Sequence, residues 1–305
     1  MLSFIIRRLL IIIPMALLVI TLTWILIRLA PGSFYTAEKK LPPAVEANIK
    51  KKYGLDKPIL SQYGILMGNI VRGDFGDSLK YEGQSVNEII ARHFPYSATI
   101  GILAYILALI LGLAAGIVAA LKQNSAFDYG SMSLAMLGLS VPNFVIGPIL
   151  VLIFSLWLYI FPPARVGGAI SYVLPVITLG AIYAAYIARL TRAGMLEVMR
   201  SDYIRTARAK GLSEWKVLLK HALRGGLIPV VSFTGPALAA LLAGTVVVER
   251  VFAIPGLGNI FIQSVLNRDE PLTLGIVAFL SILIMIFNLI VDISYAFLDP
   301  RIRYE

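Results

Sequence analysis

Long runs without a charged residue alternate with short basic segments along this chain. Six charge-free intervals come close to or exceed the roughly 20 apolar residues that one helix needs to cross a bilayer: 9–27, 94–121, 129–164, 166–188, 225–248 and 271–291. Because backbone in lipid must satisfy its own hydrogen bonds, spanning segments of this kind are helices. The pattern predicts an all-α polytopic membrane protein with six transmembrane helices.

These intervals divide the chain into four predicted regions. They are a cytoplasmic lead with the first transmembrane helix (1–30), an external helical region (31–94), a transmembrane core (95–298) with a cytoplasmic loop at 191–226, and a cytoplasmic tail (299–305). The first apolar run follows two Arg but is too long for the core of a signal peptide, so we interpret it as a retained helix.

The basic residues are distributed unevenly between the two sides that six spans create. The chain carries a formal net charge of +10, although only 14% of its residues are charged and its mean hydropathy is +0.83. Short segments on one side hold 14 Lys and Arg, nine of them within 189–224, and those on the other side hold three. This is the positive-inside pattern, which predicts that both ends of the chain are cytoplasmic. It also argues against nucleic-acid binding as the source of the charge.

Residues suited to catalysis or metal binding are sparse. The chain has no Cys and two His, His93 and His221, which excludes thiolate chemistry and disfavours a His-based metal site. It contains neither an H-E-x-x-H motif nor a G-x-x-x-x-G-K-[ST] phosphate loop. A proton-coupled carrier would need several acids within the spans, and Asp292 near one edge is the one candidate. A carrier of that kind and an intramembrane enzyme are therefore disfavoured, and a scaffold without transport stays an alternative.

The predicted external region carries helix signals. "LPPAVEANIKKKYG" places Pro near a helix start and Gly54 at its end. Ser85 and Glu88 form a capping-box pattern. A further stretch has one apolar face and is expected to lie on the membrane surface: Ile59, Leu60, Tyr63, Leu66, Met67 and Ile70.

The most basic segment is "SDYIRTARAKGLSEWKVLLKHALRGG", at 201–226. Ser201 is a candidate N-cap for a short helix over Tyr203–Lys210, and Gly211 is a candidate end residue with positive φ. Ser213 is a candidate cap for a second helix, whose apolar positions follow helical spacing: Trp215, Leu218, Leu219, Ala222 and Leu223. Two interpretations fit: a basic amphipathic helix on anionic lipid, or a docking element for a partner protein.

The amino-acid sequence of this segment resembles the EAA loop of ABC-importer permeases, in the dipeptide/oligopeptide branch. Arg205, Thr206 and Ala207 stand at the EAA positions, and Gly211 stands at the Gly of the motif. Further stretches resemble the same family: "YGLDKPILSQYG", "RGDFGDS", "VVVERVFAIPGLGNIF" and "FNLIVDISYAFLDPRIRY". The resemblance covers nearly the whole chain and implies a type I importer permease fold in a bacterial or archaeal cell membrane.

The resemblance also implies partners and a coupling site. A homologous second permease, two cytoplasmic ATPases that use ATP and Mg, and an external solute-binding protein are expected, with no cofactor bound by this chain. The residues expected to couple to an ATPase are Tyr203, Ile204, Arg205, Thr206, Ala207, Lys210, Gly211 and Leu212. The implied cargo is an oligopeptide or dipeptide; a nickel chelate, glutathione or another small nutrient is the alternative.

A few polar positions near or within the spans are candidates for a gate or a path. Glu249 is expected to hold the external Gly/Pro turn that contains Pro255 and Gly256. Asn288 and Asp292 of the last span are further candidates. Side chains that could line a path are Asn143, Thr178, Ser232 and Thr234.

Overall fold

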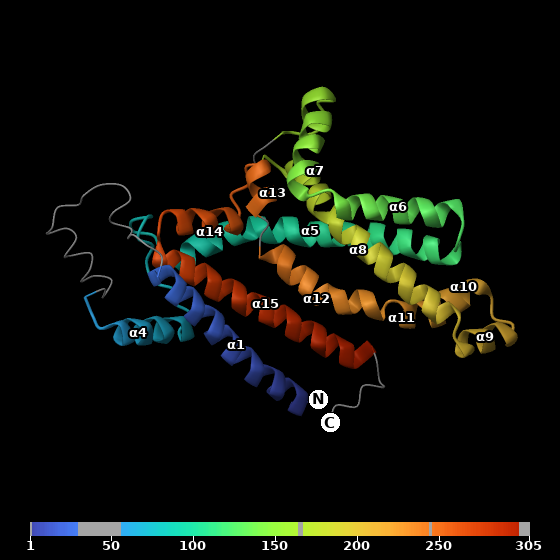
Figure 1. The fold of residues 1–305 in the computed structure, drawn as a ribbon, viewed down its shortest axis with the longest axis horizontal. Coiled ribbons are helices and arrows are strands. Elements are labelled where there is room, and N and C mark those ends of the chain that lie inside the picture. The colour runs from blue at the N-terminus through green and yellow to red at the C-terminus, as the bar shows by residue number, and fades with distance from the viewer. Residues whose placement is uncertain (1, 30–55, 164–166, 244–245, 299–305) are drawn as a thin grey trace.

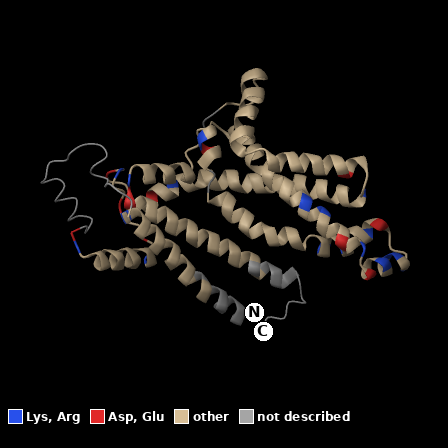
Figure 2. Ribbon diagram, in the orientation of Figure 1, with Lys and Arg blue, Asp and Glu red and all other residues tan. Residues whose placement is uncertain are grey.

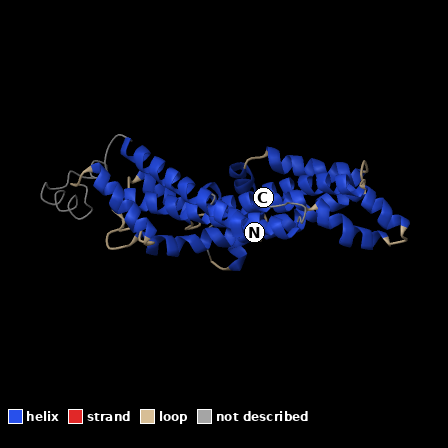
Figure 3. Cartoon of the chain, turned by 90° about the horizontal axis from the view of Figure 1, so that it is seen from below, coloured by secondary structure: helices blue, strands red, loops and turns tan. Residues whose placement is uncertain are grey.

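The chain folds into an elongated array of helices (Figures 1 and 3). The structure is a computed structural model that describes residues 2–29, 56–163, 167–243 and 246–298. Its first half contains α1 (Leu2–Leu29), α4 (Ile59–Val71), α5 (Val86–Leu121), α6 (Ala126–Ser140), α7 (Asn143–Leu150) and the π-helix η1 (Val151–Trp157). Its second half contains the 3-10 helix η2 (Ala169–Tyr172), α8 (Val173–Met199), α9 (Asp202–Ala209), α10 (Glu214–Lys216), the π-helix η3 (Val217–Ala222), α11 (Leu223–Gly226), α12 (Ile228–Leu242), α13 (Val246–Val251), α14 (Leu257–Leu266) and α15 (Glu270–Leu298). Apart from an isolated bridge between Asp77 and Ser85, these described residues form no β-structure.

The helices α5 and α8 form the centre of the molecule. Small residues let them approach closely: a Cβ on Gly116 would overlap the Ala188 carbonyl, as at small-residue crossings in membranes. Leu179 and Ile187 of α8 are buried in the surrounding core. On one side α12 packs against both helices, α15 packs against α12, and α1 packs against α15; α6 covers α8 elsewhere (Figure 1).

Charged side chains gather at the two ends of the array, and the helices between them are nearly free of charge (Figure 2). We call the end formed by residues 122–128 and 201–226 the basic end. The opposite end is formed by residues 72–86 and α14, and α13 lies between α14 and α7, nearer the middle of the array (Figure 1). An apolar middle between two polar ends is the arrangement that a bilayer requires.

By length and composition, three described helices can cross a membrane unaided, and up to five spans result if each bent pair counts as one. The predicted total of six stays a prediction. The interval 129–164 is not one straight span, because α6 and the α7–η1 segment meet at 103°. Pro142 lies at this break, and the preceding Val141 is extended, with φ −95° and ψ 119°, as the steric demand of the following Pro ring favours.

One helix signal of the predicted external region is confirmed, and its external location stays a prediction. The capping box is present, since Ser85 Oγ accepts a hydrogen bond from Glu88 N and Glu88 accepts one from Ser85 N. Helix α4 is held against α1, because the Tyr63 and Trp24 rings lie 5.2 Å apart and the Tyr63 and Thr21 hydroxyls share a 2.6 Å hydrogen bond. The stretch "LPPAVEANIKKKYG" lies outside the described residues.

Candidate functional site: the basic loop and the outer clamp

The loop at the basic end begins with the predicted short helix. α9 runs from Asp202 to Ala209, with Ser201 at its N-cap position. The Ser201 hydroxyl does not cap α9; it donates to the Val198 carbonyl at 2.6 Å instead. Gly211 has a φ of +75°, in the left-handed region that favours glycine. The expected helix, corner and second helix are therefore present in this order.

The coupling residues predicted from the sequence divide between two faces of α9. Ile204 and Ala207 are buried in a cluster with Met195, Val217, Leu218 and Ala222, so they anchor α9 and present nothing to a partner. Arg205, Thr206, Lys210 and Gly211 are exposed, Tyr203 is 47% exposed, and Leu212 is half-buried. The surface that α9 offers is therefore short, basic and made partly of small residues.

An ion pair closes the corner at Gly211. Arg208 donates from Nε and NH2 to the two carboxylate oxygens of Glu214, at 2.9 and 3.2 Å. Such a bidentate contact fixes the relative direction of the two flanking helices. This pair was not predicted, although opposite charges on either side of a predicted glycine corner were the available signal.

The predicted apolar face of the second helix is partly wrong. Val217, Leu218 and Ala222 are buried, whereas Trp215 and Leu219 are 69% and 59% exposed. The reason is that residues 217–222 form a π-helix. Its i→i+5 hydrogen bonds shift the side chains out of the 3.6-residue rhythm on which the prediction rested.

Close backbone contact fastens the loop to α8. A Cβ on Gly194 would overlap the Gly226 carbonyl oxygen, and the Tyr203 hydroxyl would lie 3.0 Å from a Cβ on Gly225. Close-packed atoms transmit a displacement directly to their neighbours. We therefore expect α9 to α11 and the end of α8 to move together.

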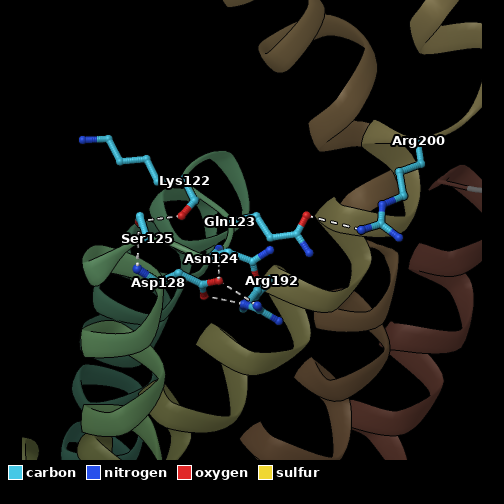
Figure 4. Close-up of polar contacts among 7 residues, drawn as sticks. All are labelled: Lys122, Gln123, Asn124, Ser125, Asp128, Arg192 and Arg200. Atoms are coloured by element: carbon cyan, nitrogen blue, oxygen red, sulfur yellow. Dashed lines mark hydrogen bonds and ion pairs between the residues drawn. The ribbon is translucent and has the colours of Figure 1, made fainter.

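A second attachment joins α8 to the turn between α5 and α6 (Figure 4). Asp128 is buried and accepts hydrogen bonds from Arg192 Nε at 2.6 Å and Arg192 NH2 at 2.7 Å. The backbone N–H of Asn124 also donates to Asp128, at 3.0 Å. Arg200 NH2 donates to Gln123 in the same turn, at 3.3 Å. The two contacts that reach α8 and the residue after it were not predicted from the sequence, because their partners lie 64 and 77 residues apart in the chain.

At the opposite end, the structure brings Glu249, Pro255 and Gly256 together as predicted. Glu249 is 1% exposed. It accepts hydrogen bonds from the Ser97 hydroxyl at 2.7 Å and from the backbone N–H of Asn259 at 2.8 Å. A Cβ on Gly256 would overlap the Glu249 carboxylate, so glycine is required for this approach.

Two further contacts tie the same turn to α5. His93 Nδ1 donates to the Pro255 carbonyl at 2.7 Å, and Ser97 Oγ accepts from the Leu257 N–H at 2.8 Å. We call Glu249, Ser97 and His93, with the turn 253–258, the outer clamp. Its geometry is that of a rigid joint between α5, α13 and α14; a role in gating stays a prediction.

Asp269, which the sequence analysis did not single out, forms a neighbouring joint. It is fully buried and accepts from the Ser78 hydroxyl and from the N–H groups of Leu79 and Lys80. It also accepts from the N–H of Leu272 in the first turn of α15, at 3.2 Å. The carboxylate thus fixes the segment before α5 on the start of α15.

The other path candidates are spread over four helices, α7, α8, α12 and α15. Thr178 is fully buried and its hydroxyl bonds to the Leu174 carbonyl of its own helix, so it does not line an open path. Thr234 accepts from Tyr105 at 2.5 Å, and Ser232 donates to the Ile228 carbonyl. Asn143 and Asn288 are half-buried on α7 and α15. The Asp292 side chain lies outside the described part of the structure.

Comparisons with known proteins show which family and which relatives this chain resembles. Residues 112–304 match the family described as "Binding-protein-dependent transport system inner membrane component", and residues 1–101 match its N-terminal companion. Oligopeptide transport system permease proteins OppB of Haemophilus influenzae and Escherichia coli are each 47% identical over the whole of both chains. The dipeptide transport system permease protein DppB of Bacillus subtilis is 43% identical over 94% of this chain and 93% of its own length.

A solved structure shares the fold. The inward-facing MetNI methionine ABC transporter matches with a TM-score of 0.58 over 69% of this chain and 96% of the transporter chain, at 18% identity. Together with the apolar helices, these matches show a multi-pass protein of the inner membrane. The chain belongs to the family of binding-protein-dependent transport system inner membrane components.

Proposed function

We propose that this chain is one of two permease subunits of an ATP-driven importer for peptides. The observation that carries the proposal is the 47% identity to oligopeptide permeases over the full length of both chains. The 43% identity to a dipeptide permease extends the same cargo class to shorter peptides. A nickel chelate, glutathione or another small nutrient is the alternative cargo within the family.

In this proposal α9 is the element that an ATPase grips. The geometry of α9 supports this role. Ile204 and Ala207 pack α9 against the rest of its own subunit. Arg205, Thr206 and Lys210 are exposed and available to a partner. An ATPase that moves α9 as a rigid body would move the end of α8 with it, through the contact between Gly194 and Gly226. ATP binding would thereby bias the subunit between two packings.

The remaining components follow from the same proposal. A homologous second permease completes the path, two cytoplasmic ATPases bind ATP and Mg, and an external solute-binding protein delivers the peptide. This chain binds no cofactor and catalyses no reaction itself. The basic end faces the cytoplasm, and the outer clamp faces the side on which the solute-binding protein docks.

Co-purification followed by an ATPase assay tests the proposal. The chain, purified from its own cell membrane, is expected to hold ATPase subunits through solubilisation and to form a complex whose ATP hydrolysis rises with the solute-binding protein. A chain that retains no ATPase under conditions that keep it folded would refute the importer role. Uptake of labelled peptides into proteoliposomes, compared with uptake of nickel chelates and glutathione, then decides the cargo.

A further inference from the structure

Two large apolar side chains project from the basic end without a partner in the core. Trp215 and Leu219 lie one helical turn apart and are 69% and 59% exposed. The π-helix turns Val217, Leu218 and Ala222 into the core and leaves these two outside. Exposed apolar surface that is rimmed by polar residues marks a site of interaction with a protein or a membrane.

A basic stripe runs beside this pair. Lys216, Lys220 and Arg224 follow one another every four residues, and all three are exposed. Residues at this spacing share one helix face. Glu214, the one acid between 213 and 226, is paired with Arg208 at 2.9 Å. We call Trp215, Leu219, Lys216, Lys220 and Arg224 the Trp215 face; its apolar stripe and its uncompensated positive stripe are adjacent.

The Trp215 face lies where the chain enters the apolar part of the molecule. Residues 214–226 lead into α12 through a bend of 51°, and the two segments together are long and apolar enough to form one bent membrane span. Figures 1 and 2 place α10 and α11 beside the charged end of α8, where α12 begins. The face is therefore at the boundary between the apolar and the charged zones.

We propose that the Trp215 face binds the anionic phospholipid surface of the membrane. Trp side chains favour the boundary between lipid tails and headgroups. Lys and Arg lay their methylene stems on apolar surface and extend their charges toward headgroups, and anionic lipids attract basic segments beside a membrane helix. The loop then has two separate surfaces: α9 for a protein partner, and the Trp215 face for lipid, which holds the second half of the loop against the bilayer.

Spin-label accessibility in nanodiscs tests this assignment. Because the chain has no Cys, Leu219→Cys gives a single labelling site that leaves Trp215 in place, and Arg205→Cys on the exposed side of α9 is the matched control. In phosphatidylcholine discs that contain phosphatidylglycerol, we expect lipid-soluble oxygen to increase the relaxation rate of the spin label at 219. A water-soluble nickel chelate is expected to leave that rate nearly unchanged. The label at 205 is expected to show the reverse.

The charge requirement is tested on the same label. Lys216→Gln with Lys220→Gln is expected to raise nickel accessibility at 219 about twofold or more in the phosphatidylglycerol discs and to change it little in pure phosphatidylcholine. Nickel access at 219 equal to that at 205 in both lipids would overturn the proposal. Shielding that appears only after ATPase subunits are added would also overturn it, because the face would then be a protein contact.

Discussion

The Asp128 carboxylate accepts two hydrogen bonds from the Arg192 guanidinium, at 2.6 and 2.7 Å, and so joins the first turn of α6 to α8. The carboxylate is almost fully buried, whereas the Arg192 side chain is 28% exposed. Removing one partner of a buried charged pair leaves the other without its bonds, which costs more than removing a surface pair.

Asp128→Asn is expected to destabilise the protein by about 1–3 kcal/mol, because Asn cannot accept both Arg192 bonds. The melting temperature of the purified protein measures this loss. Asp202→Asn is the control, since Asp202 pairs with Arg205 on the surface, where both side chains are more than 70% exposed. Equal melting temperatures for the two variants would show that the Asp128–Arg192 pair does not hold α6.

Gly194→Ala is expected to separate the basic loop from α8, because the added Cβ would overlap the Gly226 carbonyl. Hydrogen exchange should speed up over 201–226, and transport per ATP hydrolysed should fall. Gly130→Ala is the matched control: a Cβ there meets nothing within 4 Å, and Ala favours the helix. An unchanged exchange rate in Gly194→Ala would contradict the proposed rigid attachment.

Gly211→Pro and Arg205→Glu are expected to uncouple ATP hydrolysis from transport while the complex still assembles. Pro cannot adopt the φ of +75° found at residue 211, since its ring fixes φ near −65°. Glu at 205 reverses an exposed charge on α9. Uptake and ATPase rates measured on one preparation test this, with Arg72→Glu at the opposite end as the charge control. Normal uptake by both α9 variants would refute the coupling role.

Gly256→Ala is expected to open the outer clamp, because the methyl group would displace the Glu249 carboxylate. Glu249→Gln should loosen the same turn more mildly: an amide group replaces one of the oxygens that accept from Ser97 and Asn259. Faster hydrogen exchange at 253–259 and slower uptake are the measured outcomes. Gly64→Ala, at a site with no atom within 4 Å of the added Cβ, should change neither.

Asp269→Asn is expected to release residues 78–80 from the start of α15, since Asn has a single acceptor oxygen where the carboxylate serves four donors. Limited proteolysis near residue 80 should become faster. Asp56→Asn, at an exposed position, is the control. Unchanged cleavage would mean that the apolar contacts of Val86 and Phe75 hold this segment without Asp269.

Local signals predicted the short elements well. The capping box at Ser85, a short helix that was predicted over 203–210 and found over 202–209, and the positive φ at Gly211 were foreseen, because each depends on neighbours within a few residues. The apolar face of the second loop helix was partly wrong, because a π-helix changes the phase of the side chains and leaves no mark in the apolar spacing.

The sequence by itself determined the class of the protein, its apolar spans, the concentration of charge at one end and the corner at Gly211, because hydropathy, charge and backbone preference are properties of local stretches. Only the tertiary structure decided that Ile204 and Ala207 face inward, that Asp128 meets Arg192, and that Ser97 of α5 joins Glu249 at the turn of Gly256. These features depend on pairs of residues far apart in the chain, whose meeting is set by packing between helices.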